Sequence, residues 1–197
     1  MKSSVSISVL AISLAWSLWF GACAPAPAPD TSEAAVATVS DSAALIERGR
    51  YLVSFGGCND CHSPKRMGPQ GPEIVPGLLL SGYPAEMPVP PFDSKMLKDG
   101  FAMLTPDLTA AAGPWGISFA ANLTPDETGL GNWTFAQFKK ALTQGKYKGM
   151  DGGCDLLPPM PWINYVELTD EDLGAMFAYL QHIPAVNNLV PAPIPPQ

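Results

Sequence analysis

The chain has 197 residues, enough for one domain with a hydrophobic core and some appended segments. Its 18 acidic residues outnumber the 11 basic ones, which leaves a net charge of −7 and no basic stripe in the sequence that could neutralise phosphates, so the composition argues against nucleic acid as a partner. With 22 prolines and 18 glycines, we expect much irregular structure around a small folded core.

Residues 1–22 are typical of an export signal, because the uncharged run 5–20 is apolar but too short for a comfortable membrane span. The sequence around Cys23 resembles a bacterial lipoprotein signal, in which this cysteine becomes the lipidated first residue. Ordinary signal cleavage after Ala24 and a retained membrane helix are the alternatives. In each case we expect the rest of the chain on the periplasmic side of a bacterial membrane. The resemblance to lipoprotein signals also implies the outer membrane rather than the inner one, because Ala24 stands in place of an aspartate.

Residues 23–41 are predicted to form a disordered tether, because they combine Ala, Pro, Ser and acidic residues without a periodic apolar face. A helix is predicted next, over residues 42–55, where apolar side chains recur at helical spacing. Asp41 or Ser42 would be its N-cap, and the glycine pair 56–57 would end it.

The segment Cys58–His62, with the sequence CNDCH, carries the strongest functional signal of the chain. In a C-x-x-C-H segment two thiols can reach the two vinyl groups of one porphyrin, while the next imidazole binds the iron. Zinc would require further paired ligands, and downstream only Cys154 and His182 remain, singly. A redox-active dithiol would be expected in a strand–helix–strand context, which does not precede this segment. We therefore predict one covalent haem c on three residues, Cys58, Cys61 and His62.

The rest of the chain is expected to alternate between loops and two further helices. Residues 64–126 are rich in proline and show little periodicity, so we predict a long, mostly irregular excursion along the haem edge, with room for a short hairpin. One helix is predicted over 134–145. Another is predicted after Thr169, with acidic residues in its first turn and an apolar stripe, and it stops before Pro184. The Pro-rich tail, 185–197, is expected to be unpacked or extended.

Met160 is the candidate for the second axial ligand of the iron. It lies in Leu156–Trp162, where three prolines restrict the backbone on both sides. Because iron–thioether bonds are weak, a ligating methionine needs a loop that holds its sulfur in place. The alternative is that Met160 only fills a gap beneath a Pro-rich turn.

The two remaining candidate ligands are weaker. His182 is expected at a helix C-terminus, where the helix dipole favours it, rather than on the iron. Cys154 could be a small buried residue, a disulfide partner of another chain or of Cys23, or a thiolate near the haem.

The first helix, the C-x-x-C-H segment, the methionine loop and the last helix together resemble a class I monohaem cytochrome c over residues 42–184. The resemblance implies an all-α cytochrome c fold around one covalent haem, with the long excursion inserted after the haem motif. It also implies that the first and last helices cross at a small residue and an aromatic one, here Gly49 and Tyr179.

Two more details follow from the resemblance. In that family a proline carbonyl accepts the N–H of the haem histidine, and Pro69 or Pro72 could serve. The stretches 120–126 and 158–173 further look like a subgroup of bacterial exported cytochromes that often neighbour dehydrogenases.

These features predict a one-electron carrier. An iron held by His62 and Met160 has no free position for oxygen or peroxide and exchanges an electron with little rearrangement. Because the chain is acidic, we expect redox protein partners with basic docking surfaces, and a role as a free carrier or as a subunit of a dehydrogenase or respiratory complex. The alternative is a haem enzyme, a peroxidase or a sulfur-compound oxidase, with a labile sixth ligand or with Cys154 on the iron.

Overall fold

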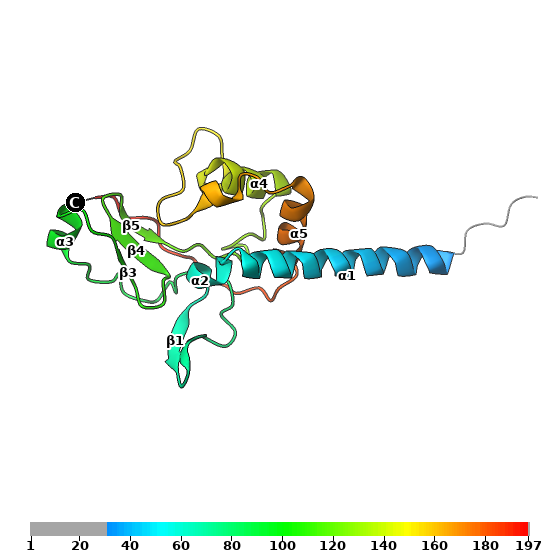
Figure 1. Ribbon diagram of the computed structural model, residues 1–197, viewed down its shortest axis with the longest axis horizontal. Coiled ribbons are helices and arrows are strands. Elements are labelled where there is room, and N and C mark those ends of the chain that lie inside the picture. Colours follow the sequence, from blue (N-terminus) through cyan, green and yellow to red (C-terminus); the bar gives the residue numbers. More distant parts are fainter. Residues whose placement is uncertain (1–30, 197) are drawn as a thin grey trace, which may run out of the picture.

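The computed structural model describes residues 31–196, with side chains from Ser42 onward. The export signal expected at 1–22 and the lipidation expected at Cys23 lie outside these residues. Within them the chain forms helices, two short antiparallel sheets and two 3₁₀ turns, η1 (Tyr147–Gly149) and η2 (Trp162–Tyr165). Figure 1 shows the larger sheet, with one short helix beside it, at the end of the molecule opposite to the start of the first helix.

Helix α1 (Thr31–Phe55) contains the predicted helix but begins earlier. An N-cap at Asp41 or Ser42 is therefore wrong, and the second half of the expected tether is helical. The run after Pro29 contains no proline until Pro64 and is rich in alanine, so that nothing in the backbone stops the helix. The early turns extend beyond the rest of the described chain (Figure 1). Among residues 31–196, no helix combines the length and the apolar character that a membrane crossing requires.

Helices α1 and α5 (Asp170–Leu180) cross closely and form the centre of the fold. At Gly49 a Cβ atom would overlap the carbonyl oxygen of Ala175 and lie 2.8 Å from the Cβ of Tyr179. The predicted crossing at a small residue and an aromatic one is thus confirmed. Around it lies an apolar core that includes five side chains of the two helices: Leu52, Val53, Leu173, Met176 and Leu180.

The other two predicted helices are confirmed as well, with the caps expected at both ends of one and at the start of the other. Helix α4 (Phe135–Gln144) begins with a capping box between Thr134 and Gln137 and ends at Gly145 in the left-handed conformation. In α5 the Thr169 side chain accepts the N–H of Asp172, and three acidic residues occupy the first turn.

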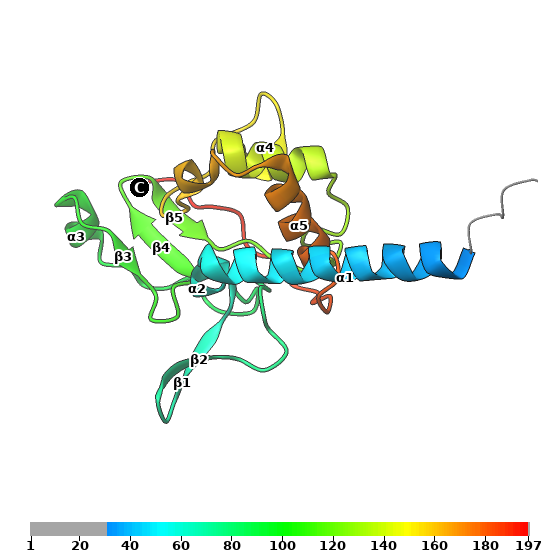
Figure 2. The same cartoon turned by 45° about the vertical axis from the view of Figure 1, so that its right-hand side comes forward.

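The excursion after the C-x-x-C-H segment contains regular strands, so that an all-α fold is wrong for this region. Strands β1 (Lys65–Gly68) and β2 (Gly71–Ile74) form a hairpin that points away from the helices (Figure 2). A second, antiparallel sheet has the order β3–β4–β5 and is accompanied by the short helix α3. The bounds are α3 Ser94–Lys98, β3 Met103–Leu104, β4 Ala110–Gly113 and β5 Gly116–Phe119. None of the strands in residues 31–196 exceeds four residues, and β4 is buried on both faces, so the alternating pattern that identifies strands is missing.

The Pro-rich tail is extended, and it packs against the excursion. Ile194 exchanges two backbone hydrogen bonds with Ile117 of β5, at 2.8 and 2.9 Å. Nearer the α5 end, the buried amide of Asn188 donates to the carbonyls of Ser81 and Tyr83 and accepts the N–H of Ala85. The tail therefore fastens the excursion to the helical part of the fold.

Candidate functional site

Helix α2 (Cys58–His62) is a single turn, separated from the end of α1 by two glycines. It carries both thiols of the C-x-x-C-H segment, and neither is in a disulfide with another described cysteine. Burial raises the pKa of the Cys58 thiol to about 11 and also raises the pKa of Cys61. Both thiols are therefore protonated at neutral pH, unlike the low-pKa thiols of redox-active dithiols.

Within 31–196, no group of three or more His, Cys, Asp or Glu side chains is placed to hold a metal ion together. Structural zinc requires four such ligands.

The His62 imidazole is oriented by a backbone carbonyl. Its Nδ1 lies 2.7 Å from the carbonyl oxygen of Ala121. Because a carbonyl can only accept, Nδ1 carries the proton, and Nε2 of the neutral ring keeps its lone pair. Burial lowers the pKa of His62, and this effect exceeds the opposing effect of the hydrogen bond to Ala121. Because the pKa is lowered, the ring is neutral at pH 7.

The expected proline acceptor of the His62 N–H is therefore wrong. Pro69 lies in the turn of the β1–β2 hairpin and Pro72 in β2, and both are exposed. The hairpin leads away from α2, so the acceptor comes instead from a segment 59 residues beyond His62 in the chain.

Residues 80–83 hold the acceptor segment in place. The N–H of Gly82 donates to the carbonyl of His62 at 2.8 Å, and that of Tyr83 donates to the carbonyl of Ala120 at 2.9 Å. Gly82 has a φ of 79°, and a Cβ there would lie 2.5 Å from the Ala120 oxygen, so that only glycine allows this approach. The Ala121 carbonyl is therefore set by backbone contacts on both sides.

Two buried asparagines support the same region, and neither was predicted from the sequence. Asn122 donates to Thr128 and to the carbonyl of Val186, and it accepts both the N–H and the hydroxyl of Thr124. Asn188 satisfies three backbone groups of the 81–85 segment. Of the two, only Asn122 has a signal in the sequence, because it lies in the stretch 120–126 that looks like a subgroup of bacterial exported cytochromes.

Met160 lies in the loop between η1 and η2 and is half-buried. The start of this loop is fixed by a 2.6 Å hydrogen bond from the N–H of Leu156 to the carbonyl of Gly145. Met160 packs against the apolar core, as does Cys58, so that both predicted residues border the same cluster.

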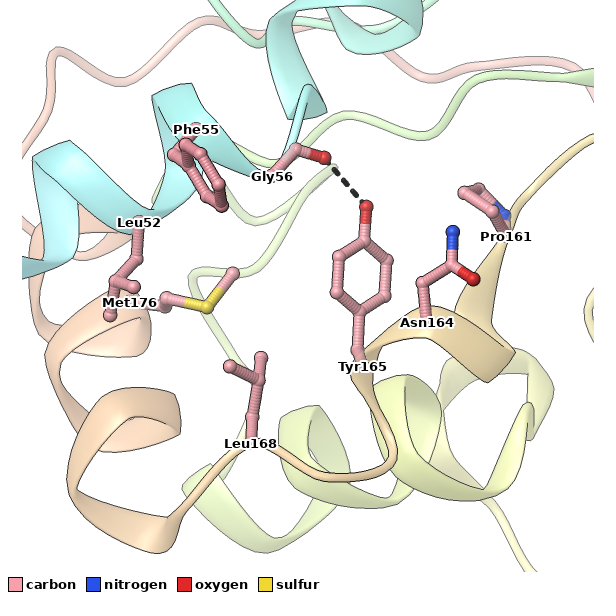
Figure 3. A pocket seen from close by; sticks show the side chains of 8 residues that line it. All are labelled: Leu52, Phe55, Gly56, Pro161, Asn164, Tyr165, Leu168 and Met176. Atoms are coloured by element: carbon pink, nitrogen blue, oxygen red, sulfur yellow. Dashed lines mark hydrogen bonds between the residues drawn. The ribbon is translucent and has the colours of Figure 1, made fainter.

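An apolar cavity of about 330 Å³ opens beside this region (Figure 3), a size typical of small-molecule sites. The Tyr165 hydroxyl donates to the carbonyl of Gly56 at 2.7 Å and so links η2 to the residues just before α2. Burial raises the pKa of Tyr165. The lining residues come from α1, η2 and α5 and from the segments next to them: Leu52, Phe55, Gly56, Pro161, Asn164, Tyr165, Leu168 and Met176.

Cys154 and His182 lie apart from this arrangement. Cys154 is exposed, in a turn whose aspartates pair with Lys140 and Lys146, so the interpretation as a small buried residue is wrong. His182 is exposed at the end of α5, where its Nδ1 lies 2.7 Å from the carbonyl oxygen of Ala178.

The residues present fit a covalently attached haem. Two thiols outside any disulfide of the described residues and an imidazole with a free Nε2 lone pair lie on one helical turn. A half-buried thioether packs against the same apolar core as the first thiol. Soft sulfur and imidazole donors in an apolar environment are what haem iron and its thioether bonds require.

No family model matches the chain, but several curated proteins do. A subunit of the nicotinate dehydrogenase of Pseudomonas putida is 31% identical over 152 residues, which cover 77% of this chain and 10% of that protein. The gluconate 2-dehydrogenase cytochrome c subunit of Pantoea cypripedii is 30% identical, covering 77% of this chain and 26% of that protein. The fructose dehydrogenase cytochrome subunit of Gluconobacter japonicus is 31% identical, covering 68% and 20%.

The chain thus spans between a tenth and about a quarter of the length of these relatives. Two of the three are named as cytochrome subunits of dehydrogenases. The similarity supports a c-type cytochrome that carries a c-type haem.

Proposed function

We propose that this chain is an exported electron-transfer cytochrome with one haem c. Thioether bonds to Cys58 and Cys61 would attach the haem, and His62 and Met160 would ligate its iron. The observation that carries the proposal is the hydrogen bond from His62 Nδ1 to the Ala121 carbonyl. It orients the ring and leaves the lone pair of Nε2 available to a metal, next to two thiols outside any disulfide of the described residues.

The haem would supply a one-electron iron couple. The residues of this chain set the conditions for that couple. His62 is held in one tautomer and one orientation, so that ligation costs little ordering. The Met160 thioether is a soft ligand that favours the reduced iron and raises the reduction potential. The apolar core, which Cys58 and Met160 border, would keep water away from the iron.

We infer further that the chain serves a dehydrogenase, as a subunit or as a dedicated carrier. This rests on the names of its relatives, two of which are cytochrome subunits of dehydrogenases. The net charge of −7 suits a partner with a basic docking surface. Export, with a lipid anchor on Cys23, would place it on the periplasmic side of the membrane, the outer one in preference to the inner.

The ligand set is tested by the sulfur-to-iron charge-transfer band of the oxidised holoprotein. We expect the band in the wild-type protein and in Cys154→Ala, and its complete loss in Met160→Ala. A band that survives Met160→Ala, or that disappears in Cys154→Ala, would contradict ligation by Met160 and favour the haem enzyme with a cysteine ligand.

Attachment and export are tested by the mass of the protein purified from membranes. The expected mass corresponds to a chain that begins at Cys23 and carries one haem and acyl groups. A mass without haem would overturn the cytochrome, whereas a mass without acyl groups would overturn only the lipid anchor.

A further inference from the structure

The stretch 158–161 of the loop that carries Met160 has a single backbone donor. Three of the four residues from Pro158 to Pro161 are prolines and have no N–H group. The remaining residue, Met160, has the single N–H of the stretch, and this N–H donates within the loop to the carbonyl of Leu157 at 3.3 Å. This stretch can therefore be tied to the rest of the fold only through its carbonyl groups and its side chains.

One such tie comes from the sheet of the excursion. The hydroxyl of Ser118 donates to the carbonyl of Pro158 at 2.7 Å, two residues before Met160. The same hydroxyl lies 3.4 Å from the carbonyl of Ala111, a longer and weaker alternative. Among the hydrogen bonds of the described residues, it is the only one that joins Pro158–Met160 to a distant element.

The donor itself is held rigidly. Ser118 lies in β5 opposite Ala111 of β4, and its neighbour Ile117 is paired on the other edge with Ile194 of the tail. A strand paired on both edges has little freedom to follow a moving loop. The bond therefore fixes the position of the loop, rather than moving with it.

We propose that Ser118 is a positioning residue for Met160, through which the inserted sheet holds the thioether on the iron. This rests on the proposed function, because it requires that Met160 is the ligand. Without the Ser118 hydroxyl, the loop leaves the iron more readily, and an added ligand competes more effectively with the thioether.

The test compares oxidised holoproteins of four variants with the wild type by titration with imidazole, which displaces a thioether from iron. Ser118→Ala and Ser118→Val remove the hydroxyl, whereas Ser118→Thr retains it in the shape of valine. Thr143→Ala is the matched control, since the Thr143 hydroxyl also donates to a backbone carbonyl, that of Lys139, within α4. The sulfur-to-iron band is recorded at each step.

We expect Ser118→Ala and Ser118→Val to bind imidazole about fivefold more tightly than the wild type, the factor that corresponds to one ordinary hydrogen bond. Ser118→Thr and Thr143→Ala should stay within about twofold of the wild type, because neither change removes the bond to the loop. If the alanine variant does not fold, the threonine and valine pair decides.

Equal affinities in the wild type and in the variants without the hydroxyl, with the band present in all, would overturn the role of Ser118 alone. The role of Ser118 would also be overturned if Ser118→Thr bound imidazole as tightly as Ser118→Val, because the hydroxyl would then not control the affinity. Absence of the band in the wild type would overturn both the role of Ser118 and ligation by Met160.

Discussion

The orientation of the His62 ring depends on buried polar side chains far from it in the sequence. Ala121 contributes only its backbone carbonyl, so its position is set by the segments that pack around it. Asn188 is a central support among these, because its amide satisfies three backbone groups between Ser81 and Ala85. A buried amide with all its partners is valuable because each backbone group left without a partner would cost free energy.

We expect Asn188→Ala to lower the free energy of unfolding of the holoprotein by about 3 kcal/mol, since it leaves the buried carbonyls of Ser81 and Tyr83 and the partly buried N–H of Ala85 without this partner. Denaturant unfolding measures the change. Asn187→Ala is the control: the Asn187 amide makes one 3.3 Å hydrogen bond to Asp126 at the surface, and its loss should cost less than about 0.5 kcal/mol. Equal losses in the two variants would contradict this account.

At the scale of the elements, the crossing of α1 and α5 sets the geometry around the site. The two helices approach so closely at Gly49 that the backbone of Ala175 occupies the space of a side chain. The C-terminal end of α1 leads directly into Cys58, so a shift of this crossing would also shift the thiols and the cavity beside them.

Two glycines of this helix pair should respond in opposite directions to the same substitution. Gly49→Ala should destabilise the protein by about 3 kcal/mol, because neither backbone can give way. Gly174→Ala should stabilise it by up to about 1 kcal/mol, because a Cβ there meets nothing within 4 Å and alanine is the better helix former. Thermal or denaturant unfolding distinguishes them, and shifts of the same sign would refute the close crossing.

The charge of the whole molecule is the property that a partner meets at long range. Seven surface ion pairs among residues 42–196 each use one basic side chain, which leaves the excess of carboxylates to determine the field. The net charge of −7 therefore acts on a basic partner before contact, and salt should weaken that attraction.

The second-order rate of electron transfer to a basic redox protein should fall about tenfold when ionic strength rises from about 0.01 M to about 0.15 M. Stopped-flow mixing at several salt concentrations measures it. The rate with an uncharged small-molecule oxidant should stay constant over the same range. A rate that is flat with the basic protein would remove electrostatic steering from the account.

Much of the helical structure and of the candidate site could be predicted because the signals are local. The caps at Thr134, Gly145 and Thr169 act on neighbouring N–H and C=O groups, so their effect needs no tertiary structure. The spacing of Cys58, Cys61 and His62 likewise lies within one helical turn. Met160 stood out by its prolines, which restrict the backbone wherever the loop lies.

The excursion could not be predicted in the same way. Its strands are too short to show a period, and β4 is buried on both faces, so their pairing depends on partners that only the folded chain supplies. The tail shows the same limit, since its proline content predicts an extended backbone but not the surface that Asn188 and Ile194 bind.

The sequence alone thus determined the C-x-x-C-H spacing and the caps of α4 and α5, because each depends on residue identity at short range. The crossing at Gly49 was implied by the family resemblance. Tertiary structure alone decided which carbonyl accepts the His62 proton and which hydroxyl reaches the methionine loop. Every residue has a backbone carbonyl, and serine is common on surfaces, so neither residue can be recognised from the sequence. Both are identified only when the fold brings distant segments together.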